Sequence, residues 1–330
     1  MDLPEFRPIF SNPHLLTIAG NFWPREIDEQ RFPATRKQYS VAPGNTVLAL
    51  EHQPLEPARG QIVLLHGLEG SASAGYFASF TQEGLLRGYG MHRLNMRTCG
   101  GTEDLCETMY HSGLTADTKF VIEQVKQPVF VVGFSLGGNV ALKLAGELGE
   151  SGLLAGVCAI STPIDLAACV RAIDKPSNIL YARRFLKRLR ERVRRMNALS
   201  PQAYGTEGLD DVKTIWEFDD RFTAPLFGFG TAANYYATQS AINYLDAIRI
   251  PTLVIAAKDD PLVPFEIYRH SAFQNNPALT LIAPEHGGHL GFLSRHKPRF
   301  WLDRVALDWI GSYEARALCS SRGKPASYAL

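Results

Sequence analysis

Cysteine is scarce in this sequence, and no two cysteines have a spacing typical of a metal site. The 330 residues contain five cysteines, at positions Cys99, Cys106, Cys158, Cys169 and Cys319. An odd number at wide and irregular spacing argues against both a disulfide framework and a structural zinc site. We therefore expect a protein of a reducing compartment without a structural metal.

Long apolar runs and an excess of charge are also missing. No run of about 18 apolar residues occurs, so no membrane-spanning helix is expected. The N-terminal sequence MDLPEFRP lacks the basic segment and apolar run of a secretion signal. Lysine and arginine number 34 against 33 for aspartate and glutamate, a formal net charge of +1, so no overall attraction to nucleic acid or to acidic membranes is expected, and either role would need a local patch. These absences predict a cytoplasmic protein with no nucleic-acid partner.

From residue 36 onward, strand and helix patterns alternate. The strongest strand signals are the continuous apolar runs QIVLLH (61–66) and PVFVVGF (128–134), which are typical of buried parallel strands. Further strands are expected at 47–52, 92–96, 155–160, 251–256 and 279–283, and helices at 116–125, 140–148 and 300–310. This alternation predicts an α/β fold with a mostly parallel sheet that helices cover on both faces.

The same patterns divide the chain into segments. Residues 1–35 show no clear period and are expected to form an irregular N-terminal arm packed on the core. Residues 36–162 and 250–313 carry the strands of the core. The intervening segment 163–249 is mostly helical and charged and has no buried-strand run, so it is expected to be an inserted helical cap. Residues 314–330 are expected to form a loose C-terminal tail.

One short motif lies directly between the strongest strand and the helix that follows it. Residues Gly133-Phe134-Ser135-Leu136-Gly137 have the pattern G-x-S-x-G. Such a turn holds its serine in a strained backbone conformation and needs small residues, here Gly133 and Gly137, two positions before and after. Ser135 would then stand at the C-terminal edge of the sheet, where open α/β sheets bind ligands. The motif predicts a nucleophilic serine.

A serine nucleophile needs a base and an acid that orients the base. In sheets of this type the chain order is serine, then aspartate or glutamate, then histidine. Asp259 and Asp260 follow one predicted strand, and His286 and His289 follow the next. Only one aspartate of an adjacent pair can face the histidine, and either histidine fits the order. A metal site on the two histidines lacks a clear third ligand.

The oxyanion of an ester-cleaving transition state needs two backbone N–H donors. The residue after the nucleophile, Leu136, supplies one donor in turns of this kind. The second is expected from the loop His66-Gly67-Leu68-Glu69-Gly70, which follows a predicted strand. Gly67 lets the backbone approach a substrate carbonyl closely, and Leu68 is the expected second donor.

At these residues the sequence resembles the α/β-hydrolase superfamily, and more narrowly the YheT-like candidate esterases (AB hydrolase type 4). The resemblance rests on segments spread over nearly the whole chain: PHLLT (13–17), HGLEGSASAGY (66–76), NMRTCGG (95–101), YHSG (110–113), GFSLGGNVALKLAGE (133–147), FDDRFTAPLFGFGTAANYY (218–236), KDDPLVP (258–264) and EHGGHLGF (285–292). It implies an α/β-hydrolase fold of about eight strands with an inserted helical cap. It also implies that Asp260 is the acid and His289 the base, and that the activity is hydrolysis of carboxylic esters without a cofactor.

The cap segment bears on the substrate. It is rich in aromatic residues, namely Phe222, Phe227, Phe229, Tyr235 and Tyr236, so an apolar roof over a small-molecule ester with a short-to-medium acyl chain is expected. The segment Arg183–Arg195 (RRFLKRLRERVRR) has the pattern of a basic amphipathic helix. A solvated basic face is the favoured interpretation, and a surface that meets lipid head groups is the other. The sequence does not determine an oligomeric state.

Three other functions compete with a soluble esterase. The first is a monoacylglycerol lipase or phospholipase that acts at membranes. The second is a catalytically silent α/β hydrolase that serves as a binding module. The third is a different reaction on the same three residues, since a fold does not fix a function.

Overall fold

The computed structural model describes residues 3–126 and 128–322, and the side chains as far as Tyr313. Its centre is an eight-stranded sheet with the order β1-β2-β4-β3-β5-β6-β7-β8. The strands are β1 (Thr35–Ala42), β2 (Asn45–His52), β3 (Gly60–Leu65), β4 (Tyr89–Leu94), β5 (Val129–Phe134), β6 (Gly156–Ile160), β7 (Thr252–Ile255) and β8 (Leu279–Ile282). From β4 to β8 all neighbours are parallel, whereas β1 and β2 form an antiparallel hairpin at one edge.

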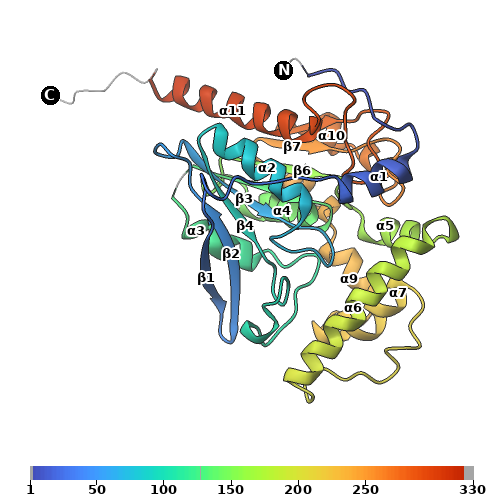
Figure 1. Cartoon of the computed structure of the whole chain (residues 1–330). Coiled ribbons are helices and arrows are strands. Elements are labelled where there is room, and N and C mark those ends of the chain that lie inside the picture. Colours follow the sequence, from blue (N-terminus) through green and yellow to red (C-terminus); the bar gives the residue numbers. More distant parts are fainter. Residues whose placement is uncertain (1–2, 127, 323–330) are drawn as a thin grey trace.

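Helices cover both faces of the sheet, as Figure 1 shows. The longer ones are α1 (Pro13–Phe22), α2 (Gly75–Leu86), α3 (Ala116–Glu123), α4 (Leu136–Leu148), α5 (Leu166–Ile173), α6 (Ile179–Leu199), α9 (Ala232–Gln239) and α11 (Trp301–Arg322). Short turns are η1 (Glu103–Leu105), η2 (Pro176–Asn178), α7 (Ile215–Phe218), the π-helix η3 (Asp219–Thr223), α8 (Ala224–Leu226), η4 (Ala241–Ala247), η5 (Phe265–Arg269) and α10 (Ala272–Asn275).

The apolar strands fill two cores at once because successive side chains point to opposite faces of a sheet. In β3, Ile62 and Leu64 pack with the residues of α2 and α11, while Val63 and Leu65 pack with those of α3 and α4. The strands from β3 to β7 are buried along their whole length. These observations confirm the predicted α/β-hydrolase fold with a mostly parallel sheet.

The segment between β6 and β7 carries α5 to α9 and supplies all but one of the buried residues of a third apolar cluster, the other being Met109. Leu186, Val193 and Met196 of α6 pack there against Phe218 and Tyr235. In Figure 1 the helices α5, α6, α7 and α9 lie together at the lower right, to one side of the sheet. The cluster gives the segment 163–249 a packed interior beside the carboxyl ends of the strands.

The structure corrects three expectations. The N-terminal segment 1–35 is not wholly irregular, because α1 begins where Asn12 caps the amide of Leu15 at 3.1 Å and Pro13 takes the first helical position. The strand β1 was not predicted from the sequence; four of its first five residues are exposed, so it lacks a continuous apolar run. The segment 314–330 is helical as far as Arg322, because α11 continues beyond the predicted end of its pattern. Residues 323–330 lie outside the described residues.

Candidate active site

The register of the sheet brings the predicted site residues to one edge. Leu65 at the end of β3 lies beside Gly133 of β5, and Gly133 lies beside Ala159 of β6. The loops that follow β3, β5, β7 and β8 therefore leave the sheet on the same side. These loops carry the serine, the two aspartates and the two histidines that the sequence singles out, together with Gly67 and Leu68.

Ser135 sits on a sharp turn between β5 and α4. Its φ of 53° and ψ of −122° are unusual for a residue with a side chain. A Cβ on Gly133 would lie 2.2 Å from the carbonyl oxygen of Gly137, and a Cβ on Gly137 would lie 2.3 Å from that of Leu65. Both positions therefore require glycine, because the backbone on either side of the serine is packed against other backbone.

Ser135, His289 and Asp260 form one hydrogen-bonded chain. The Oγ of Ser135 lies 3.0 Å from Nε2 of His289, and Nδ1 of His289 lies 2.9 Å from Oδ2 of Asp260. The other carboxylate oxygen, Oδ1, accepts from the amides of Leu262 and Val263 at 2.9 and 3.1 Å. With a carboxylate at Nδ1, that nitrogen carries the proton, which leaves Nε2 as an acceptor for the serine hydroxyl.

The neighbouring aspartate and histidine form a separate pair. Oδ2 of Asp259 lies 3.0 Å from Nδ1 of His286, and its Oδ1 accepts from the amide of Gly288 at 2.9 Å. The His286 side chain is 46 % exposed, whereas that of His289 is 10 % exposed. The two aspartates thus point to different histidines. Across the described part of the chain, no three histidine, cysteine or acidic side chains are grouped as metal ligands.

The two expected oxyanion donors lie beside the serine. Leu68 and Leu136 line the same cavity as Ser135 and His289. No acceptor is bonded to the amide of either leucine among the residues that the structure describes. A Cβ on Gly67 would lie 3.0 Å from the Cβ of Ser135, so glycine allows this loop to approach Ser135 closely.

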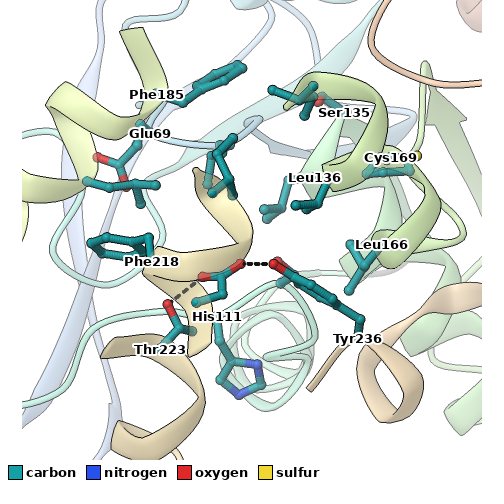
Figure 2. Close-up of a pocket in the computed structure, with 18 of the residues that line it drawn as sticks. Glu69, His111, Ser135, Leu136, Leu166, Cys169, Phe185, Phe218, Thr223 and Tyr236 are labelled. Carbon is teal, nitrogen blue, oxygen red and sulfur yellow. Dashed lines mark hydrogen bonds between the residues drawn. The ribbon is translucent and has the colours of Figure 1, made fainter. Parts of the chain in front are cut away.

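Two cavities meet at Ser135. A narrow one, of about 90 Å³, extends between the sheet and the helices that follow β6 (Figure 2). Its walls come mainly from apolar and aromatic side chains, among them Leu166, Phe185, Phe218 and Tyr236. A wider one, of about 350 Å³, lies on the other side of the serine, between α1, the start of α2 and α6.

Comparison with known proteins shows the family of the chain. The family model described as the alpha/beta hydrolase fold matches residues 60–295. This chain belongs to the α/β-hydrolase family. It is 30 % identical to the candidate esterase YheT of Escherichia coli (strain K12) over 328 residues, which cover 96 % of this chain and 95 % of YheT. It is 29 % identical to phospholipase ABHD3 of Mus musculus, over 75 % of this chain and 62 % of the relative.

A solved structure shares the fold of this hydrolase. The esterase Pf2001 of Pyrococcus furiosus aligns with a TM-score of 0.55 at 16 % identity, over 96 % of this chain and 99 % of that one. In the described part of the hydrolase, every helix is too short or too polar to cross a membrane.

His66, to which the sequence alone gives no role, supports the loop of the hydrolase that carries Gly67 and Leu68. The ring is fully buried, accepts from the amide of Met96 through Nε2 at 3.1 Å, and donates through Nδ1 to the carbonyl of Gly67 at 2.8 Å. Burial lowers the pKa of His66 to about 4, against the opposing effect of the Gly67 carbonyl. The neutral ring thus fixes the loop beside Ser135.

A buried ion pair joins the same loop to α6. The guanidinium of Arg192 donates to both carboxylate oxygens of Glu69, at 2.9 and 2.8 Å, and to the hydroxyl of Thr98 at 2.8 Å. Glu69 has a φ of 56° and follows the expected donor Leu68 directly. The expectation of a wholly solvated basic face for Arg183–Arg195 is therefore wrong at Arg192, whose cost of burial is offset by this pairing.

Polar groups around Asp219 interrupt the apolar wall of the narrow cavity. Asp219 accepts from the hydroxyls of Thr223 and Tyr236, both at 2.6 Å, in the bonds drawn in Figure 2. Burial raises the pKa of Asp219 to about 6. Phe222, Phe227 and Phe229, which the sequence suggests as part of an aromatic roof, are not among the residues that line this cavity.

Proposed function

We propose that the protein is a serine esterase that hydrolyses carboxylic esters through an acyl-enzyme intermediate. The observation that carries the proposal is the chain of two hydrogen bonds from Ser135 through His289 to Asp260. A serine hydroxyl is a weak nucleophile unless a base accepts its proton, and an oriented neutral imidazole is such a base.

In the first half of the proposed reaction, Oγ of Ser135 attacks the ester carbonyl carbon while Nε2 of His289 accepts the hydroxyl proton. The carbonyl electrons move to the oxygen, and the amides of Leu68 and Leu136 stabilise that oxyanion. Asp260 stabilises the imidazolium. When the carbonyl re-forms, the bond to the alcohol breaks, and the leaving oxygen takes the proton from His289.

In the second half, water attacks the acyl-enzyme. His289 accepts a proton from the water as the new C–O bond forms, and the second oxyanion occupies the same two amides. Collapse of this intermediate breaks the bond to Oγ, and the proton returns from His289 to Ser135. The products are a carboxylic acid and an alcohol, and the cycle needs no metal or cofactor.

The two cavities offer separate places for the two parts of an ester substrate. We propose that the narrow cavity takes the acyl chain and the wider one the alcohol, with residues 163–249 acting as a cap. Each buried methylene contributes about 0.8 kcal/mol, so binding improves until the chain reaches the wall near Phe218 and Tyr236. This favours acyl chains of short to medium length.

A second candidate is hydrolysis of lipid esters, as by a monoacylglycerol lipase or phospholipase. The breadth of the cavity on the alcohol side favours it, since a bulky leaving group could be accommodated beside α1 and α6. The phospholipase relative from mouse agrees with this candidate. Both candidates use the same proposed chemistry and differ in the alcohol.

Labelling with a fluorescent fluorophosphonate, which forms a covalent bond with an activated serine, tests the proposal. We expect the parent protein to be labelled and Ser135→Ala to be unlabelled, with a loss of ester turnover on the order of 10⁶. Ser73→Ala, at an exposed serine of the wider cavity, is the matched control and should be labelled like the parent. A parent protein that neither reacts nor hydrolyses aryl esters would instead indicate the silent binding module.

A further inference from the structure

The helix α1 exposes an apolar face. Leu15, Ile18 and Phe22 recur at helical spacing and are 51, 45 and 69 % exposed. Leu16 and Gly20, on the opposite side, are buried against the core. A helix that exposes an apolar face to water indicates a surface that another phase or molecule covers.

The first turn of α6 extends this face. Ile179 and Leu180 are 41 and 74 % exposed. The two helices meet there, because His14 stacks on Tyr181 with ring centroids 5.8 Å apart and the Arg184 guanidinium lies 5.8 Å from the centre of the Phe22 ring.

We call the five apolar side chains of these two helices, Leu15, Ile18, Phe22, Ile179 and Leu180, the α1–α6 patch. They are half of the ten large apolar side chains that are exposed in the described part of the chain, so the patch is a concentration of exposed apolar surface.

Positive charge flanks the patch. Arg183, Arg184, Lys187 and Arg188 are exposed and follow Leu180 along α6. The one acidic residue of that helix, Glu191, lies 4.0 Å from Lys187. The structure thus divides the basic segment 183–195, because its second half includes the buried Arg192, whereas the basic side chains of its first half are exposed beside the apolar patch. Of these, Arg188 also donates to the carbonyl of Glu69 at 3.0 Å.

The patch also borders the wider cavity. Ile18, Phe22, Arg184 and Arg188 are among the residues that line it, together with Ser135. A molecule that lies on the patch is therefore next to the opening that leads to the serine.

We propose that the α1–α6 patch and its basic flank dock this protein on the surface of an anionic lipid bilayer. Apolar side chains that enter the boundary between head groups and acyl chains, beside lysine and arginine that meet anionic head groups, are typical of interfacial helices. The flank has four basic side chains and one acidic one, so its charge is complementary to such a surface. Delivery of a lipid ester to Ser135 rests on the proposed function, whereas docking itself does not.

Co-sedimentation with vesicles tests docking directly. The Ser135→Ala protein is used so that the lipid is not consumed. We expect it to sediment with vesicles of phosphatidylcholine that contain phosphatidylglycerol, to bind pure phosphatidylcholine vesicles much less, and to be released by high salt.

Two double variants separate the apolar and basic contributions, and neither changes a residue that lines the cavities. Leu15→Ser with Leu180→Ser removes apolar contact, and Arg183→Glu with Lys187→Glu reverses charge. Each is expected to weaken binding to the anionic vesicles by about tenfold or more, since one basic residue near such a surface is worth a factor of about five.

Matched controls place the same changes elsewhere. Leu55→Ser with Leu86→Ser replaces two leucines that are 65 and 52 % exposed outside the patch. Lys119→Glu with Lys126→Glu makes the same change of net charge on α3 and three residues after its end, and α3 lies far from the start of α6 in Figure 1. Both controls should bind like the parent.

Three outcomes would overturn docking on lipid. The first is an absence of vesicle binding. The second is binding that the patch variants and the controls affect equally. The third is a dimer in sedimentation analysis that Leu15→Ser with Leu180→Ser dissociates, which would assign the patch to a second copy of this chain. Each outcome leaves the fluorophosphonate result unchanged, so failure of docking and failure of the proposed esterase activity are distinguishable.

Discussion

Replacement of Arg192 by methionine is expected to destabilise the protein and to slow its proposed hydrolysis of esters. The change keeps the length of an unbranched side chain but removes the charged partner of the Glu69 carboxylate, which then keeps only the Tyr110 hydroxyl, 3.2 Å from Oε1. The Arg192 and Glu69 side chains are only 7 and 2 % exposed, so water cannot replace the lost hydrogen bonds. Loss of one partner of a buried pair costs about 3–5 kcal/mol, a large share of an ordinary free energy of unfolding.

The effect on turnover follows from the position of Glu69 next to Leu68. Without Arg192 the strained backbone at Glu69 is less firmly held, and the amide of Leu68 can move away from the oxyanion. Loss of one oxyanion donor lowers kcat by a factor of about 10²–10³, which is the upper limit of the effect expected for Arg192→Met. Because the donor acts mainly in the transition state, kcat should fall more than KM rises.

Urea unfolding and steady-state hydrolysis of a p-nitrophenyl ester measure the two effects. Arg194→Met is the matched control, because Arg194 lies on the same helix but pairs with Asp210 at the surface, where such pairs contribute at most about 1 kcal/mol. The double variant Glu69→Gln with Arg192→Met should lose less than the sum of the single variants, since neither charge is then left unpaired. If Arg192→Met resembles Arg194→Met in both assays, the argument from the buried pair is wrong.

Three further predictions follow from the site. Asp260→Asn should lower kcat by about 10⁴ by presenting the wrong partner to His289, the proposed base, whereas Asp259→Asn should be mild in the same assay; reversed effects would transfer the role to Asp259. In a series of p-nitrophenyl esters, kcat/KM should peak at short-to-medium acyl chains, and a steady rise to long chains would contradict the acyl cavity. Between pH 6.5 and 4, the unfolded chain protonates His66 and the folded chain does not, so this residue should lower the free energy of unfolding by up to about 3 kcal/mol as pH falls. Denaturant unfolding across this pH window should show that the free energy of unfolding falls less in His66→Asn than in the parent. An equal fall in both proteins would refute the contribution of His66.

The parts of the fold that sequence predicts best are those that local chemistry determines. The apolar run that becomes β5 can only be a buried strand or part of a buried helix, and the glycines at 133 and 137 decide in favour of a tight turn after it. Asn12 and Pro13 are a recognised signal for the start of a helix, so the capped start of α1 is predictable from the sequence although residues 1–35 show no clear period. The exposed β1 gave no continuous apolar run to recognise.

The parts that sequence alone leaves open depend on contacts between distant residues. Asp259 and Asp260 have the same chemistry and nearly the same position. They differ because Oδ1 of Asp260 is held by the amides of the turn that follows, which leaves Oδ2 for His289. From the residues alone both aspartates stayed open, and the family resemblance was needed to favour one.

The pairing of Glu69 with Arg192 shows the same limit more strongly. Nothing near Glu69 in the sequence marks it as buried, and Arg192 is one of eight basic residues in a segment whose pattern favours a solvated face. The two meet across 123 positions because the helices after β6 fold back over the loop after β3. Arg192 is therefore buried despite its basic amphipathic pattern, because its partner Glu69 lies far away in the sequence, in a loop at the edge of the sheet where Ser135 stands.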